Sequence, residues 1–89
     1  MKISKIKRDK ICEQILALLY SKSPNSLFTS QIAKEIARDE EFVKKLLFEL
    51  KQKKLVIPIR KNPKGIYYSK RIRWRMSNKA YEIYASNQL

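Results

Sequence analysis

Two apolar patterns separated by one short break constrain the fold of this chain more than any other feature. Segment 29–37 carries apolar residues at helical spacing, and segment 39–54 repeats them at i, i+3, i+4 and i+7. Thr29 and Asp39 suit the N-cap positions of these two helices. Because helices joined by so short a break at Arg38 cannot be collinear, the pattern predicts a helix-turn-helix.

Another helix is expected earlier, over residues 8–21, where apolar residues recur at helical spacing with Asp9 as the N-cap. Cys12 lies in its apolar stripe and is expected to be a small buried core residue. Residues 1–7 are expected to form a basic arm. The cations of this end, from Lys2 to Lys10, are open to two interpretations, a solvated terminus, which we favour, or a flexible arm that contacts a partner.

The segment 55–76 predicts a β-hairpin. Its first strand is short, and Pro58 places that strand at a sheet edge. The turn contains Gly65, the only glycine of the chain. In the second strand, Ile72, Trp74 and Met76 alternate with Arg71, Arg73 and Arg75. This alternation predicts one buried face and one exposed, cationic face, with Trp74 in the core.

A last short helix is predicted over 78–86, with Ser77 or Asn78 as its cap. Tyr81 and Tyr84 share one face of it, and either complete the core or contact a second copy. With 89 residues the chain suits one domain. The fold class is therefore α+β, in the order α-α-α-β-β-α.

The composition restricts the function. The 21 lysines and arginines outnumber the 8 acidic residues, a net charge of +13 that a polyanionic partner would relieve. A single cysteine and no histidine exclude an internal disulfide and a Cys/His metal site. We expect no cofactor, no small-molecule ligand, no catalysis and no membrane span. The expected location is the cytoplasm, in association with the nucleoid.

The charge distribution is strongly local. Between Glu49 and Glu82 there are eleven cations and no acidic residue. These cations are Lys51, Lys53, Lys54, Arg60, Lys61, Lys64, Lys70, Arg71, Arg73, Arg75 and Lys79. A phosphate backbone favours such an arrangement because each neutralised phosphate releases condensed counterions.

Two stretches, TSQIAKEIARDEEFVKKLLFELKQKKLV and RWRMSNKAYEIY, carry a family resemblance. The chain resembles the winged helix-turn-helix superfamily of DNA-binding proteins, in particular its small archaeal and viral transcription regulators. The resemblance implies a three-helix core with a two-stranded wing, and a third helix whose N-terminal half enters the major groove. The chain departs from the family pattern at two places. It has Ala37-Arg38 where the family often has glycine, and it has the acidic pair Glu40 and Glu41 at the start of the third helix, where many DNA-binding members are neutral or basic.

Helical spacing places Glu41, Lys44, Lys45 and, further along, Phe48 and Gln52 opposite the apolar face of the third helix. The candidate DNA-binding residues lie on the second helix, the third helix and the wing. They are Ser30, Gln31, Lys44, Lys45, Arg60, Lys61, Lys64, Tyr67, Tyr68, Lys70, Arg71 and Arg73. Tyr67 and Tyr68 either stack on the ligand or pack within the hairpin. We interpret Glu40 and Glu41 as favourable to the helix dipole, so the wing is expected to supply most of the affinity.

The function predicted from the sequence is duplex DNA binding by a small transcription regulator or a chromatin-type protein, with limited base readout. A homodimer through the last helix is a further expectation. Two alternatives remain. One is RNA binding in translation. The other is a protein-interaction adaptor, which an exposed apolar patch including Phe48 on the third helix would favour.

Overall fold

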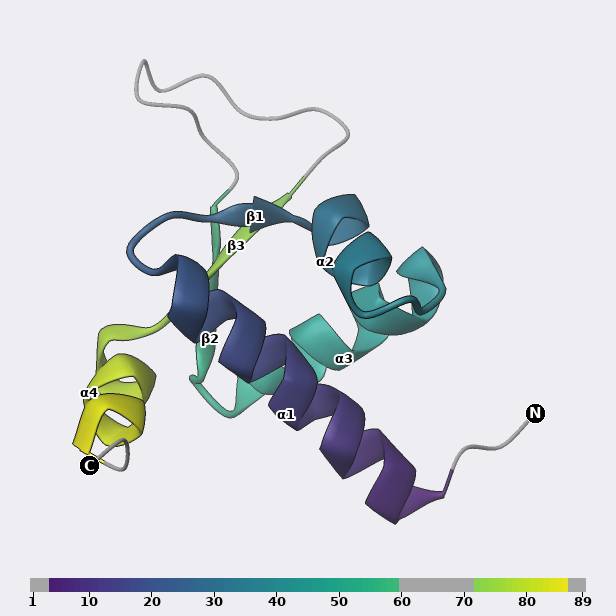
Figure 1. The fold of residues 1–89 in the computed structure, drawn as a ribbon, viewed down its shortest axis with the longest axis horizontal. Helices are drawn as coiled ribbons and strands as arrows, with labels where there is room; N and C mark the ends of the chain where they lie inside the picture. The colour runs from purple at the N-terminus through teal and green to yellow at the C-terminus, as the bar shows by residue number, and fades with distance from the viewer. Residues whose placement is uncertain (1–3, 60–71, 87–89) are drawn as a thin grey trace.

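The computed structural model describes residues 4–59 and 72–86. Within these ranges it contains four helices and three short strands (Figure 1). The elements are α1 (Lys5–Lys22), β1 (Leu27–Phe28), α2 (Thr29–Glu35), α3 (Glu40–Gln52), β2 (Val56–Ile59), β3 (Arg73–Met76) and α4 (Asn78–Ser86). The order predicted from the sequence therefore lacked one element, the two-residue strand β1.

Helix α1 begins earlier than the sequence pattern indicated. Ser4 is its N-cap, and the Ser4 hydroxyl accepts a hydrogen bond from the Lys7 amide at 3.3 Å. The prediction of Asp9 as N-cap was wrong, because Asp9 lies inside the helix. The residues between them include lysine and arginine, which are good helix formers, so the helix extends back to the first suitable cap. The predicted basic arm is thus helical from Lys5 onward.

The turn between α2 and α3 ends at the expected N-cap of α3. The Asp39 carboxylate accepts a hydrogen bond from the Phe42 amide at 3.1 Å, which confirms Asp39 as the N-cap of α3. Helix α2 ends at Glu35, and Ala37 then adopts a φ of 55°. This is the left-handed region that glycine usually occupies, and an alanine there carries a steric cost. Ala37 therefore occupies the backbone conformation that the glycine common at this turn would adopt without steric cost.

Thr29 has a different role from the one predicted. The N-cap of α2 is Phe28, and Thr29 is the first residue of the helix. The Thr29 hydroxyl is buried and accepts a hydrogen bond from the indole nitrogen of Trp74 at 2.8 Å. Trp74, 45 residues away in the sequence, therefore binds the Thr29 hydroxyl oxygen that was predicted to cap α2.

The three strands form one antiparallel sheet in the order β1-β3-β2. Trp74 of β3 is paired with Leu27 on one side and Pro58 on the other. Pro58 lies on an edge strand, as predicted, where its missing N–H does not interrupt the sheet. The expected two-stranded hairpin is therefore part of a three-stranded sheet that β1 completes.

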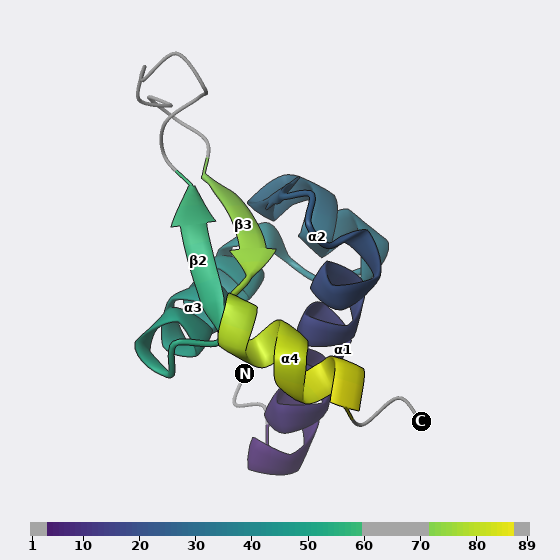
Figure 2. The same ribbon diagram turned by 90° about the vertical axis from the view of Figure 1, so that its left-hand side faces the viewer.

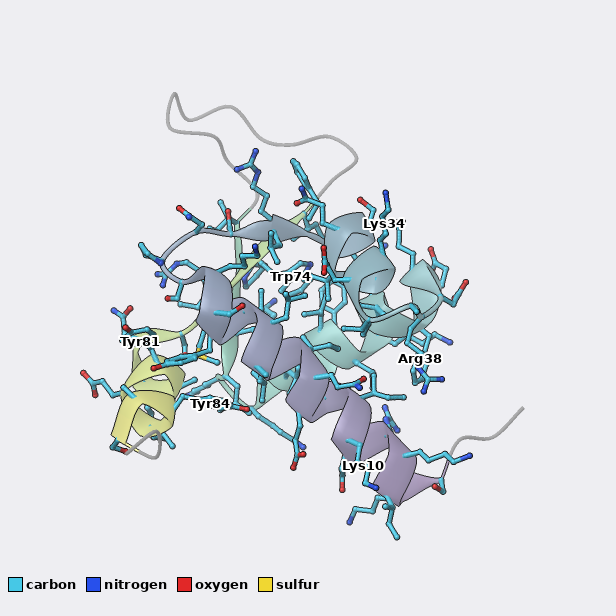
Figure 3. The ribbon with its side chains drawn as sticks, in the orientation of Figure 1. Lys10, Lys34, Arg38, Trp74, Tyr81 and Tyr84 are labelled. Atoms are coloured by element: carbon cyan, nitrogen blue, oxygen red, sulfur yellow. The ribbon has the colours of Figure 1, made fainter. Side chains whose placement is uncertain are left out.

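The core lies among α1, α2, α3 and the sheet (Figure 2), and Figure 3 shows Trp74 within it. Its buried apolar residues are Ile11, Ile15, Leu16, Leu19, Ile32, Ala33, Val43, Leu46, Leu47, Leu50, Val56, Trp74, Met76 and Ala80. Phe48 packs edge-on against Trp74, with the ring centroids 5.3 Å apart. Cys12 was expected to be a buried core residue; it packs against this core but is only half-buried.

Helix α4 packs its tyrosines against the C-terminal end of α1. The ring of Tyr20 lies 5.2 Å from that of Tyr81 and 5.5 Å from that of Tyr84, measured between centroids. Tyr84 is half-buried against the core, and burial raises the pKa of its phenol above the ordinary value. Ser77 precedes the helix, and its hydroxyl accepts a hydrogen bond from the Ala80 amide at 3.1 Å.

Candidate nucleic-acid interface

A groove lies where the starts of α2 and α3 approach the sheet. Its volume is about 310 Å³, and its lining residues are Phe28, Thr29, Ser30, Glu40, Glu41, Lys44 and Ile72. The sequence predicted Ser30 and Lys44 as contact residues on two different helices. The helix-turn-helix brings both into the same groove.

Helix α3 separates its apolar and polar residues cleanly. Val43, Leu46, Leu47 and Leu50 are buried, since their spacing places them on one face of the helix. Glu41, Lys44 and Lys45 are exposed. Lys44 lines the groove, whereas Lys45 is not among its lining residues. The two lysines predicted to contact the ligand are thus both accessible, but only one belongs to the groove.

Phe48 does not belong to the exposed face of α3, contrary to the expectation from helical spacing. It is half-buried and packs against Trp74, while the Lys51 ammonium lies 5.9 Å from its ring centroid. The aromatic ring turns inward because the bulk of Trp74 extends to the side of α3. The exposed apolar patch that would have favoured an adaptor therefore does not form around Phe48.

Two carboxylates, from Glu40 and Glu41, line the groove beside Lys44. They are also the acidic residues of the first turn of α3, where the positive end of the helix dipole favours them. Capping of the helix is already performed by Asp39. The groove itself is thus not cationic, and any affinity for a polyanion has to come from the positive residues around it.

Gln31 has a local structural function. Its side-chain oxygen accepts a hydrogen bond from the Phe28 amide at 2.8 Å, across the start of α2. This bond satisfies one of the amides that a helix start leaves without an intrahelical partner. Gln31 is not among the residues that line the groove, whereas its exposed neighbour Ser30 is.

Arg73 contacts Phe28, one of the residues that line the groove. Its guanidinium carbon is 4.5 Å from the ring centroid of Phe28, a cation–π geometry. Phe28 and Arg73 are paired residues of β1 and β3, so the sheet sets this contact. Phe28 was not predicted from the sequence, although an apolar pair directly before Thr29 was a signal for a short strand.

The predicted exposed, cationic face of β3 is partly covered. Both Arg73 and Arg75 are half-buried. Arg75 donates hydrogen bonds to the Met76 carbonyl at 3.2 Å and to the Asn78 side-chain oxygen at 3.5 Å. The reason is that β1 and the start of α4 lie beside this face, which a two-stranded hairpin would have left open.

Seven predicted contact residues lie outside the described residues. They are Arg60, Lys61, Lys64, Tyr67, Tyr68, Lys70 and Arg71. In residues 4–59 and 72–86, no three histidine, cysteine or acidic side chains are grouped so that they could hold a metal ion. The same part of the chain has no helix that is long and apolar enough to cross a membrane.

This arrangement defines a winged helix-turn-helix fold: α1, α2 and α3 pack as a helical body, and β2 and β3 pair at its side. Solved structures share it. A mutant of MepR from a multidrug-resistant S. aureus clinical isolate is 22% identical, with a TM-score of 0.66 over 92% of this chain and 63% of that one. A mutant of Lactococcus lactis ZitR in the apo form is 16% identical, with a TM-score of 0.64 over 89% and 57%.

A second mutant of S. aureus MepR, bound to an oligodeoxyribonucleotide, is 25% identical and has a TM-score of 0.64 over 93% of this chain and 66% of that one. The chain thus spans less than two thirds of the length of each of these structures. No protein-family model matches it, and no curated protein matches it in sequence. At these identities the likeness establishes the fold.

Proposed function

We propose that this protein binds duplex DNA as a small transcription regulator or a chromatin-type protein. The observation that carries the proposal is the groove at the starts of α2 and α3, with Ser30 and Lys44 in its wall and Arg73 against Phe28, another of its lining residues. The structure of MepR with an oligodeoxyribonucleotide, which has the same fold, supports a nucleic-acid partner.

In the proposed complex α3 lies in the major groove, where Lys44 and Lys45 contact phosphates or guanine. Ser30 and Gln31 contact the backbone from the start of α2. Glu40 and Glu41 repel nearby phosphates, so this helix contributes little net attraction. Most of the affinity comes from Arg73 and from the cations of the segment 60–71, which are Arg60, Lys61, Lys64, Lys70 and Arg71. Tyr67 and Tyr68 of the same segment are uncharged contacts.

We propose α4 as the contact for a second copy of the chain. Tyr81 is 42% exposed and Ile83 is 47% exposed, two of the large apolar residues that the described part of the chain leaves accessible. A two-fold dimer would present two equivalent grooves to paired half-sites. The proposed location is the cytoplasm, with the protein on the nucleoid.

Titration with random duplex DNA at several salt concentrations tests the main proposal. The logarithm of the binding constant should fall linearly with the logarithm of the salt concentration, by about 0.9 for each neutralised phosphate. Replacing Lys44 and Lys45 together by glutamine should reduce the slope by about 1.8, if each contacts one phosphate.

The matched control is Lys22→Gln, at the C-terminal end of α1, compared with Lys44→Gln alone. It removes the same charge away from the groove and should change the slope less. Equal slopes for the two single variants would refute the interface. Competition with structured RNA tests the alternative partner, since duplex DNA should be displaced only by an excess of RNA.

A further inference from the structure

A second cationic surface lies at the start of α1 and the end of α3. The two elements meet around a groove of about 400 Å³ whose lining includes Lys5, Arg8 and Lys53. We call this the α1–α3 basic surface. It comprises these three residues and the cations next to them in the sequence, Lys7 and Lys10 in the first two turns of α1 and Lys54 after α3. The five lysines among them are exposed, and the Arg8 side chain is 42% exposed.

The acidic residues near this surface do not neutralise it. Glu49 forms an ion pair with Arg8, and Asp9 lines the same groove. Three cations and these two carboxylates line the groove itself, and one of the carboxylates is already paired. The excess of positive charge comes from Lys7 and Lys10 of α1 and from Lys54, outside the lining, with Glu13 as the further acidic residue of this part of α1.

The α1–α3 basic surface lies at the other end of the body from the proposed DNA interface. In Figures 1 and 2 the start of α1 lies at the bottom, whereas the outer ends of β2 and β3 lie at the top. Figure 3 places Lys10 at the lower end of the molecule and Lys34 of α2 at the upper end. The same duplex segment that contacts the starts of α2 and α3 is therefore not in position to cover the α1–α3 basic surface.

The local energetics favour an anionic partner here. The first turn of α1 contains no acidic residue, and Lys5 and Lys7 lie at the positive end of the helix dipole. The helix dipole and the mutual repulsion of the two lysines both destabilise positive charge at the start of α1. A polyanion reverses the sign of both effects, because phosphates are attracted by the lysines and by the dipole alike.

We propose that the α1–α3 basic surface binds a second DNA duplex, so that one molecule bridges two DNA segments. This inference rests on the proposed function, which supplies the first duplex. A duplex fits better than a membrane surface, which needs a continuous apolar face beside the cations. In the described part of this surface, Ile6 is the only large apolar side chain that is strongly exposed.

The test uses the full chain and two duplexes of equal length. One duplex is attached to beads, the second carries a fluorophore, and the measured quantity is the labelled duplex captured through the protein. Wild-type protein should capture it in a salt-sensitive manner. Replacing Lys5 and Lys7 together by glutamine should lower capture at least fivefold, while fluorescence anisotropy shows single-duplex affinity equal within twofold to that of the Lys22→Gln control.

A second variant separates loss of charge from loss of folding. Lys7 is the third residue of α1 and Ser4 is its N-cap, so Lys7→Glu forms a capping box with Ser4. Lys7→Glu should therefore raise the thermal midpoint and still reduce capture. A variant that is more stable and bridges less has lost the surface charge, not the fold.

The other outcomes are equally decisive. No capture by wild-type protein that binds a single duplex overturns bridging and leaves the proposed function intact. Unchanged capture by the Lys5 and Lys7 double variant also overturns it, and assigns bridging to a dimer with two grooves. Reduced binding of the double variant to phosphatidylserine vesicles, with unchanged capture, identifies a membrane as the partner instead. Absence of single-duplex binding refutes the proposed function itself.

Discussion

The hydrogen bond between Thr29 and Trp74 joins α2 to the sheet, and Thr29→Val tests what it contributes. The indole of Trp74 is fully buried, Thr29 is 8% exposed, and the donor–acceptor distance is 2.8 Å. Valine keeps the shape of threonine but removes the acceptor, so the indole N–H stays buried without its partner. An unsatisfied buried donor costs about 1–3 kcal/mol. For a domain of this size that corresponds to a fall in Tm of about 5–20 °C.

A double-mutant cycle isolates this hydrogen bond from the loss of packing. In a Trp74→Phe background the donor is absent, so Thr29→Val should cost less than about 0.5 kcal/mol, and the coupling energy should lie in the range of about 0.5–3 kcal/mol. Urea unfolding followed by far-ultraviolet circular dichroism is the appropriate assay, because Trp74 is the only tryptophan and fluorescence would be lost. Equal costs of Thr29→Val in both backgrounds would show that the hydrogen bond contributes nothing.

Three further predictions concern the turn, the groove and the thiol. Ala37→Gly should raise the free energy of unfolding by about 0.5–1 kcal/mol, because glycine adopts the φ of 55° without steric cost, and a lower urea midpoint would contradict this. Glu41→Gln should raise affinity for all duplex sequences alike in anisotropy titrations; a changed preference at one base position would instead indicate base readout. Burial raises the pKa of the Cys12 thiol above its ordinary 9.0, so at pH 8 iodoacetamide should alkylate the folded chain more slowly than the urea-unfolded chain. The same shift should lower stability as the pH rises past 9.0 towards the folded pKa, because the unfolded thiol ionises first; a stability that is flat over this range in urea titrations would contradict it.

Part of the candidate interface could be predicted from the local sequence alone. Helical spacing placed Lys44 and Lys45 on the exposed face of α3, and both are exposed. It failed for Phe48, because spacing along one helix does not include the width of the residue packed beside it. Here that residue is Trp74, which reaches the flank of α3 and turns the aromatic ring inward.

The covered arginines of β3 illustrate the same limit. Alternation predicted Arg73 on an exposed face, and its neighbour Trp74 is indeed buried. Alternation does not reveal a third strand, and β1 has only two residues, too few to produce a periodic signal. The contact between Arg73 and Phe28 therefore came only from the structure.

By itself, the sequence determined which faces of the helices are buried, where α3 begins and that Trp74 belongs to the core, since these follow from spacing and from the chemistry of nearby residues. Only the tertiary structure decided that Thr29 bonds to Trp74 instead of capping its own helix, that Ser30 and Lys44 line one groove, and that Arg73 contacts Phe28. The physical reason is that a residue's local preference competes with partners that are distant in sequence. The competition is resolved only when packing brings those partners within hydrogen-bonding and van der Waals distance.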